Sequence, residues 1–341
     1  MIVLTHSRLL RWVAATAVLA GAATQVRCGG AAPATAPVVG EVALVSGDLT
    51  ASDRGDLVVI PLSGGAMNVL GSGVSANSPL AYSSADHAIL GVSIAGQTPQ
   101  ISSYRLGERT WTKIIDGRKP LLSNTNRLAF CDPDGRLTVM DLITGAATVV
   151  ASLWSFSSCT PMAWSQDGRL AFVERTPLGS PGGPGPIALF IRNPDGAMKE
   201  LPVPEALSLG ISAVSWSADG ERIALSAPKR QIVVKDANTG ETVSSFRGDL
   251  ARYAPDQDKL AVLHHANLES DASIEVYAGS SLESQRKFGK IRRLGFDWVA
   301  GGNAIVVAMD DSIGFWRLRP DNLVTRSVGK KVFANILWIP P

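Results

Sequence analysis

Histidines are the first residues to consider for chemistry, because an imidazole can act as a base or a metal ligand near neutral pH. The chain has four of them, His6, His87, His264 and His265. No Gly-x-Ser-x-Gly sequence accompanies them, so the nucleophile elbow of serine hydrolases is missing. Adjacent strand residues point to opposite faces, so at most one of His264 and His265 would face a shared site. The sequence therefore assigns no catalytic residue and no metal ligand, although an acid–base or metal role for one of these two histidines stays open.

The glycine-containing motifs indicate turns more than ligand sites. Asp167-Gly168 and Asp219-Gly220 could suggest cation ligands, but the Asp-x-Asp-x-Asp-Gly spacing of a calcium loop is absent. Residues 179–186 read Gly-Ser-Pro-Gly-Gly-Pro-Gly-Pro, without the Gly-Lys-Ser/Thr ending of a phosphate loop. Their prolines also remove backbone donors. We interpret this segment as a surface insertion and predict no cofactor.

A repeat of about 40 residues must position whatever site exists. Each copy has a short apolar strand, a polar turn that often contains Asp-Gly, and a second apolar strand. The clearest copies are residues 163–172 and 215–225, and weaker copies begin at 81, 252 and 295, with an eroded copy at 121–130. A second hairpin follows each copy, with Gly, Asn or Asp at turns that need positive φ, and with strands rich in Val, Ile and Leu.

The hairpin count indicates how the ends of the chain are used. Seven second hairpins are present, at residues 57–70, 101–114, 137–150, 188–203, 232–246, 274–288 and 313–328. Only six first hairpins are complete. The C-terminal strand 335–339 and the early strand 41–47 would supply the seventh. The sequence therefore predicts an all-β, seven-bladed β-propeller of four-stranded blades, closed by the C-terminal strand joining the N-terminal blade. Such closure leaves no long exposed sheet edge.

Other architectures fit less well. A two-sheet β-sandwich does not explain the regular repeat, whereas six or eight blades stay open because the copies near residues 41 and 121 are weak. Trp164, Trp216 and Trp338 occupy equivalent positions in their strands. They could stack on a ligand, but we expect them to pack between neighbouring blades.

The repeat also carries a family resemblance. The pattern Trp-Ser-x-Asp-Gly-x-Arg, followed by alternating apolar residues and alanine, resembles the TolB-like and WD-repeat propellers. The resemblance covers roughly residues 40–341, and the copies at 163 and 215 match it best. It implies a fold more than a function. Some members act in the bacterial envelope, some are scaffolds, and some precede a serine hydrolase domain, for which the expected propeller leaves no length here.

The N-terminus is typical of a secretory signal. Residues 1–23 contain Arg8, Arg11 and no acidic residue, then an apolar stretch, then the small residues Ala20-Gly21-Ala22. A buried N-terminal helix is the alternative interpretation. We expect a flexible linker at residues 24–38 and the propeller at 39–341, which would place the mature protein in the periplasm or outside the cell.

Cleavage of that signal changes the charge balance. The formal net charge is +2, and loss of Arg8 and Arg11 gives +2 − 2 = 0. No dense Lys/Arg stripe remains, so nucleic acid is not an expected partner. Cys28 could carry a lipid anchor, but Arg27 before it fits a lipidation signal poorly. Contact with a membrane is expected only through such an anchor.

The two remaining cysteines are placed by the predicted topology. Cys131 ends the second strand of the third blade, and Cys159 lies on the connection that enters the fourth blade. Both should lie on one face of adjacent blades, and an exported compartment permits oxidation. We predict a Cys131–Cys159 disulfide, which requires Cα atoms within roughly 7 Å. Two free thiols are the alternative.

A binding surface is expected on the face that bears the longer loops. In a propeller, the turn between the second and third strands of a blade shares a face with the connection to the next blade. Candidate binding residues on this face, by position and charge, are Arg175, Lys229, Arg230, His264, Asp310 and Asp311. We predict a monomeric, non-enzymatic module or scaffold of the cell envelope that binds a protein or peptide. A propeller hydrolase or lyase, or a small-ligand binder using the central funnel, is the alternative and would need titratable side chains converging on the axis. A structural subunit of a larger envelope assembly is a third possibility.

Overall fold

The computed structural model shows an all-β architecture. It describes residues 40–47, 54–94, 98–108, 110–152, 161–175, 187–207, 209–265, 271–289, 295–299, 301–329 and 332–341. Within these ranges the chain forms 28 β-strands and one short 3-10 turn, η1 (Glu205–Leu207). No helical segment in this described part is long and apolar enough to cross a membrane.

The described strands form seven antiparallel blades of four strands, here named A to D from the centre outwards. Blade 1 consists of β28 (Val332–Ile339), β1 (Glu41–Ser46), β2 (Arg54–Pro61) and β3 (Asn68–Ser75), and blade 2 of β4 (Ala81–Ser83), β5 (Ala88–Ser93), β6 (Gln100–Arg105) and β7 (Trp111–Asp116). Blade 3 consists of β8 (Arg118–Leu122), β9 (Arg127–Cys131), β10 (Arg136–Asp141) and β11 (Ala147–Ser152), and blade 4 of β12 (Met162–Trp164), β13 (Leu170–Arg175), β14 (Ile187–Arg192) and β15 (Met198–Leu201). Blade 5 consists of β16 (Ala213–Trp216), β17 (Arg222–Ala227), β18 (Gln231–Asp236) and β19 (Thr242–Arg247), and blade 6 of β20 (Leu250–Tyr253), β21 (Lys259–His264), β22 (Ala272–Ala278) and β23 (Ser281–Gly289). Blade 7 consists of β24 (Gly295–Trp298), β25 (Ala304–Met309), β26 (Ser312–Arg317) and β27 (Asn322–Ser327).

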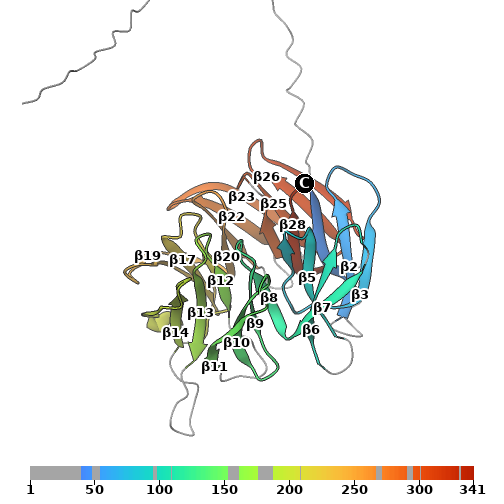
Figure 1. Cartoon of the computed structure of the whole chain (residues 1–341). Helices are drawn as coiled ribbons and strands as arrows, with labels where there is room; N and C mark the ends of the chain where they lie inside the picture. Colours follow the sequence, from blue (N-terminus) through green and yellow to red (C-terminus); the bar gives the residue numbers. More distant parts are fainter. Residues whose placement is uncertain are drawn as a thin grey trace, which may run out of the picture. The chain divides into compact units, whose positions relative to one another are not determined.

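The blades follow one another around a common centre (Figure 1). The A strands of successive blades are neighbours from β28 through β4, β8, β12, β16 and β20, and β24 returns to β28. Between β20 and β24, Arg252 Nη1 donates to the carbonyl oxygen of Phe296 at 2.7 Å. A single residue pair, Val74 with Ser93, also joins the outer strand of blade 1 to blade 2. The prediction of a closed propeller is therefore confirmed.

The C-terminal strand completes the N-terminal blade, as the hairpin count predicts. β28 pairs antiparallel with β1, so that Glu41 lies opposite Ile339 and Val42 opposite Trp338. Arg326 at the rim of blade 7 reinforces the closure, because its Nη1 donates to the carbonyl oxygen of Pro61 in blade 1 at 3.0 Å. Closing the ring with the two ends of the chain means that blade 1 has no A–B turn.

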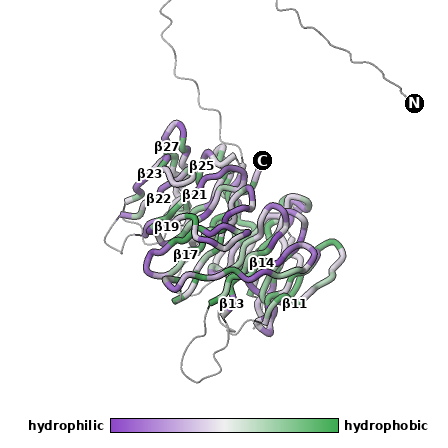
Figure 2. Tube along the Cα trace, turned by 90° about the vertical axis from the view of Figure 1, so that its left-hand side faces the viewer, coloured by the Kyte–Doolittle hydropathy of each residue, from purple (hydrophilic) through white to green (hydrophobic). Residues whose placement is uncertain are grey.

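The core lies between the blades and explains their apolar B and C strands. Strands such as β21 are buried on both faces because each face packs on a neighbouring blade. Leu260 and Val262 pack toward blade 5, whereas Ala261 and Leu263 pack toward blade 7. Apolar stretches accordingly run through the strands, and hydrophilic stretches lie at several of the turns that join them (Figure 2).

The repeat tryptophans connect neighbouring blades, as expected for Trp164 and Trp216. Trp164 Nε1 donates to the carbonyl oxygen of Leu121 at 3.1 Å, and Trp216 Nε1 donates to that of Ala163 at 3.0 Å. Trp298 makes the same contact between blades 7 and 6, donating to the carbonyl oxygen of Arg252 at 2.9 Å. Trp338 packs between blades but differs, because its Nε1 is buried without a hydrogen-bond partner among the described residues.

The Asp-Gly motifs form the turns between A and B strands. Asp167 accepts a hydrogen bond from the Ser165 hydroxyl and forms an ion pair with Arg169, whose Nε lies 2.8 Å from Asp167 Oδ2. The guanidinium of Arg169 then lies 4.8 Å from the ring centre of Trp216 in the next blade. Asp219 accepts from the Ser217 hydroxyl in the same way. These aspartates therefore hold turns together, which is the interpretation favoured by their spacing.

Some sequence predictions concern residues outside the described ranges. These are the signal, the linker, Cys28 and the insertion at 179–186. Cys131 ends β9 as expected, is 5% exposed and is disulfide-bonded. Cys159 lies outside the described residues, so the Cys131–Cys159 pairing stays a prediction.

Candidate functional site

The two faces of the ring are distinguished by the turns they bear. The B–C face carries the turns between B and C strands and the connections between blades, and the A–B face carries the A–B and C–D turns. The predicted binding residues reach the B–C face from four consecutive blades. Arg175 ends β13, Lys229 and Arg230 lie between β17 and β18, His264 ends β21, and Asp310 and Asp311 lie between β25 and β26. The side chain of Arg175 lies outside the described part.

The β17–β18 turn holds two basic residues in an unusual backbone conformation. Lys229 has φ of +64° and Arg230 has φ of +61°, in the left-handed region that favours Gly and Asn. Lys229 is exposed and Arg230 is half-buried. A left-handed conformation costs a side-chain-bearing residue roughly 1–2 kcal/mol. Two consecutive basic residues at this tip are therefore less stable than the Asn-Gly that such a turn prefers.

Arg230 also connects blades 5 and 6. Its Nη2 donates to the carbonyl oxygen of His265 at 2.9 Å, and its Nε lies 3.7 Å from Asp249 Oδ1. Asp249 in turn accepts a hydrogen bond from the backbone N–H of His265. The arrangement fixes the position of this turn relative to the next blade, and Lys229 is its exposed charge.

His264 belongs to a separate group of polar side chains on blade 6. Its Nε2 lies 2.9 Å from Glu275 Oε2, which also accepts a 2.6 Å hydrogen bond from the Tyr277 hydroxyl. Gln285 Nε2 donates to the other carboxylate oxygen at 2.8 Å. Burial and the hydrogen bond to Glu275 raise the pKa of Tyr277 to about 12, so the phenol stays protonated. These contacts hold His264 against its own blade.

One titratable pair lies on the A strands, where a funnel site would need such groups. Arg252 of β20 approaches Asp297 of β24 at 3.5 Å. Burial raises the pKa of Asp297, and the charge of Arg252 counteracts that rise. However, Asp297 Oδ2 accepts a hydrogen bond from the backbone N–H of Trp338. The pair therefore joins blades 6, 7 and 1, which is a structural role.

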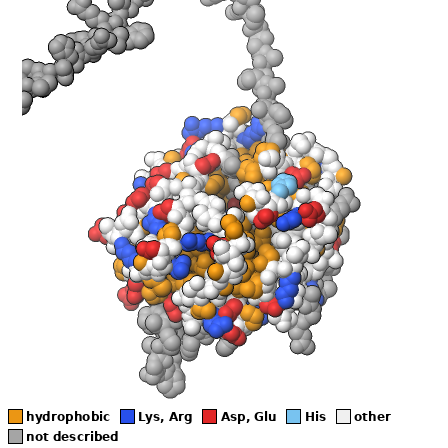
Figure 3. Space-filling model, viewed as in Figure 1, with side chains coloured by type: hydrophobic (Ala, Val, Ile, Leu, Met, Phe, Trp, Pro, Cys, Tyr) orange, Lys and Arg blue, Asp and Glu red, His pale blue; other side chains and the backbone are white. Residues whose placement is uncertain are grey.

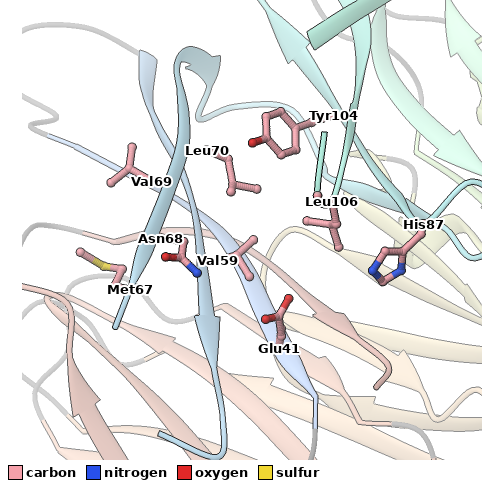
Figure 4. A pocket seen from close by; sticks show the side chains of 10 residues that line it. Glu41, Val59, Met67, Asn68, Val69, Leu70, His87, Tyr104 and Leu106 are labelled. Atoms are coloured by element: carbon pink, nitrogen blue, oxygen red, sulfur yellow. The ribbon is translucent and has the colours of Figure 1, made fainter. Parts of the chain in front are cut away.

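A pocket of about 630 Å³ lies on the opposite, A–B face, at the junction of blades 1 and 2 (Figure 4). Its size falls within the range of about 300–1,000 Å³ that is typical of small-ligand sites. Blade 1 supplies Glu41 and Val59 together with residues 67–70, and blade 2 supplies His87, Tyr104, Leu106 and Gly107. Glu41, His87 and Tyr104 are its ionisable side chains. The lining thus combines aliphatic side chains with a carboxylate, an imidazole, a phenol and the amide of Asn68.

A tyrosine behind the pocket holds the imidazole in place. The Tyr82 hydroxyl and His87 Nδ1 are 2.7 Å apart, and the two rings meet edge to face at 6.0 Å. His87 has φ of +48°, a further left-handed residue that is not glycine. Burial raises the pKa of Tyr82, and the nearby negative charge of Glu41 raises it further. The tyrosine is therefore a neutral hydrogen-bonding group.

Sequence reasoning missed this pocket because its residues lie outside the repeat pattern. Glu41 precedes the apolar run of β1, and His87 ends an A–B turn with no Asp-Gly motif. The predicted ring closure places their two blades side by side. It does not indicate that both side chains face the space between them, which depends on the local register and on the left-handed backbone of His87.

Comparison with known proteins supports the fold. No family model matches the chain, and no curated protein sequence is similar to it. Among solved structures, a putative 6-phosphogluconolactonase from Bacteroides fragilis is similar with a TM-score of 0.60 at 13% identity, covering 90% of this chain and 100% of that one. TolB from Acinetobacter baumannii gives 0.53 at 14% identity, covering 89% and 67%. The Swd1 (Cps50) β-propeller domain of Myceliophteria thermophila gives 0.51 at 13% identity, covering 74% and 86%.

These similarities show the fold alone, because the identities are low. They confirm the resemblance to TolB-like and WD-repeat propellers at the level of architecture. Their names include an enzyme as well as propellers of other kinds, so the fold does not by itself decide between catalysis and binding.

Proposed function

We propose that this protein is an exported propeller of the cell envelope that binds a protein or peptide partner through the B–C face of blades 5 to 7. The observation that carries the proposal is the β17–β18 turn, where Lys229 and Arg230 both adopt left-handed backbone conformations. Strain of this kind, of order 1–3 kcal/mol per residue, tends to persist where function requires it. An exposed tip gives no packing reason for choosing lysine over asparagine or glycine.

The surroundings of the turn suit a polar protein surface. Arg230 anchors the turn to blade 6, and Asp310 and Asp311 bring acidic side chains to the same face on blade 7. Both charge signs therefore occur on this face, as they do on the side of the molecule drawn in Figure 3, where Lys, Arg, Asp and Glu side chains lie among neutral ones. Mixed charges favour recognition of a specific folded or peptide partner over general attraction to a polyanion.

Export rests on the N-terminal sequence and is supported by the chemistry of Cys131. Disulfides persist in oxidising compartments such as the periplasm, and Cys131 is disulfide-bonded. The structural similarity to TolB fits a periplasmic propeller as well. Fractionation of expressing cells, with the N-terminal residue of the purified protein determined by mass spectrometry, tests this part. A protein that keeps residues 1–23 in the cytoplasm would contradict it.

Affinity capture from envelope extract tests the binding function. Wild-type protein is compared with the double variant Lys229→Gly/Arg230→Gly, and Asn126→Gly serves as the matched control because Asn126 is also left-handed, with φ of +59°. We expect the control to capture the same partner as the wild type and the double variant to lose it. The melting temperature of the double variant should stay close to that of the wild type, because the strain that glycine relieves is offset by the loss of the Arg230 contacts to His265 and Asp249.

The opposite outcomes would decide against the proposal. Equal capture by the double variant would remove the β17–β18 turn from the binding surface. Failure of the wild type to capture any partner, together with thermal stabilisation by a small molecule, would favour the small-ligand alternative.

A further inference from the structure

Glu41 is an isolated carboxylate in the wall of the pocket between blades 1 and 2. It is half-buried, and it makes no hydrogen bond or ion pair with any described residue. It lies at the start of β1, on the side of the strand that faces blade 2. A half-buried carboxylate gains from a cationic partner, because the protein around it screens the interaction less than bulk water does.

The remaining walls determine the shape of that partner. Val59 and Leu70 of blade 1 face Leu106 of blade 2 across the pocket, so an aliphatic chain would be buried on both sides (Figure 4). His87 presents a flat ring at the edge, which the Tyr82 hydroxyl and the hydrogen bond from the Leu106 N–H to the His87 carbonyl oxygen (2.9 Å) hold in place. A planar cation could therefore stack on an already ordered surface.

We propose that this pocket binds an alkyl guanidinium, such as an arginine side chain, with its head group paired to Glu41 and its methylene chain between Leu70 and Leu106. A guanidinium forms two parallel hydrogen bonds to one carboxylate, and it is more weakly hydrated than an ammonium. The cavity of about 630 Å³ exceeds one side chain, so it also has room for adjoining peptide backbone. The site lies on the face opposite the β17–β18 turn, so it is independent of the partner surface proposed above.

Isothermal titration calorimetry of the purified protein tests the assignment with defined probes. These are the blocked peptide N-acetyl-Leu-Arg-Leu-amide, the same peptide with citrulline or lysine in place of arginine, and agmatine. Citrulline keeps the shape of arginine without its charge. We expect the arginine peptide to bind at least about tenfold more tightly than the citrulline peptide, which is the effect of a charge-assisted contact. Binding of agmatine as tight as that of the peptide identifies a free small molecule as the ligand source, and weaker binding identifies a peptide.

Protein variants then locate the site. Glu41→Gln should lower the affinity for the arginine peptide at least about tenfold, and Glu41→Asp, which keeps the charge, should restore part of it. Glu108→Gln is the matched control, because Glu108 lies on the same face of blade 2, pairs with Arg105 at 3.4 Å and has a side chain that is 58% exposed. This control should bind as the wild type does.

Four results would overturn the inference: equal affinity for the citrulline peptide, unchanged affinity in Glu41→Gln, a lysine peptide that binds at least as tightly, or no measurable heat at about 1 mM probe, the weak end of specific binding. Thermal melting of each variant shows that it is folded. None of these results depends on whether the B–C face captures a partner.

Discussion

The repeat tryptophans allow a direct measurement of what one buried hydrogen bond between blades contributes. Trp216 and Trp338 occupy equivalent positions on the A strands β16 and β28, and both pack against a neighbouring blade. Trp216 Nε1 donates to the carbonyl oxygen of Ala163, whereas Trp338 Nε1 is buried without a partner among the described residues. Replacing each tryptophan by phenylalanine removes a similar apolar volume, so the difference between the two variants reports mainly on the hydrogen bond.

The expected magnitudes follow from these contacts. Trp216→Phe loses a hydrogen bond worth about 1 kcal/mol and leaves the Ala163 carbonyl oxygen unsatisfied, at a further cost of about 1 kcal/mol or more. Trp338→Phe removes a buried donor that already has no partner, so the same terms vanish or become favourable. We expect Trp216→Phe to be less stable than Trp338→Phe by about 2 kcal/mol, or about 4 °C in melting temperature for a domain of this size.

Urea unfolding followed by circular dichroism, together with thermal melts, measures this difference. Trp164→Phe provides a repeat of the experiment, because Trp164 Nε1 also donates to a carbonyl oxygen of the preceding blade, that of Leu121. It should behave like Trp216→Phe. If Trp338→Phe costs as much as either of the other two, the hydrogen bonds between A strands do not contribute measurably, and packing alone holds adjacent blades together.

Three further expectations concern other parts of the fold. Cys159→Ser should lower stability by roughly 3 kcal/mol if its partner is Cys131, and a mass showing two free thiols in the wild type would exclude that pair. Gly248→Ala should lower the free energy of unfolding by about 1–3 kcal/mol, because the added Cβ would overlap Val262 Cγ1 of β21 and Ile232 Cδ1 of β18. An unchanged melting temperature would show that these two side chains can move away. Hydrogen bonds from two backbone N–H groups lower the pKa of Asp236. Its contribution to stability is therefore present above about pH 4 and is lost as the pH falls through the lower pKa of the folded state. Asp236→Asn should make the free energy of unfolding fall less steeply with acid, and an unaltered pH dependence would assign the acid sensitivity to other carboxylates.

The sequence predicts the propeller well because its repeat residues each perform a local task. An aspartate like Asp167 recurs at the A–B turn because it binds groups of that turn, and a tryptophan like Trp216 recurs because it binds the neighbouring blade. Closure of the ring by β28, the strand of Trp338, is also predictable, since an unpaired strand at each end of the propeller must find a partner. The missing partner of its indole is not predictable, because one residue's local register determines whether a carbonyl oxygen lies within reach.

The candidate sites are less predictable for a related reason. Position in the topology is enough to bring Lys229 and Asp310 to one face, and the structure places them there. It is not enough to show that Lys229 has a left-handed backbone or that Arg230 is anchored to blade 6. Both depend on three-dimensional contacts that no local sequence pattern specifies.

The break in the repeat at blade 1 connects the fold to the pocket. Every other blade has a turn joining its A and B strands, but β28 and β1 come from opposite ends of the chain and have no such turn. Glu41 therefore begins its strand without a preceding hairpin residue to bind its carboxylate, in contrast to Asp167 and Asp219, which are satisfied within their turns. A carboxylate that has no partner among the described residues, at a junction without an A–B turn, suits the proposed ligand, whereas those of Asp167 and Asp219 bind groups of their own turns.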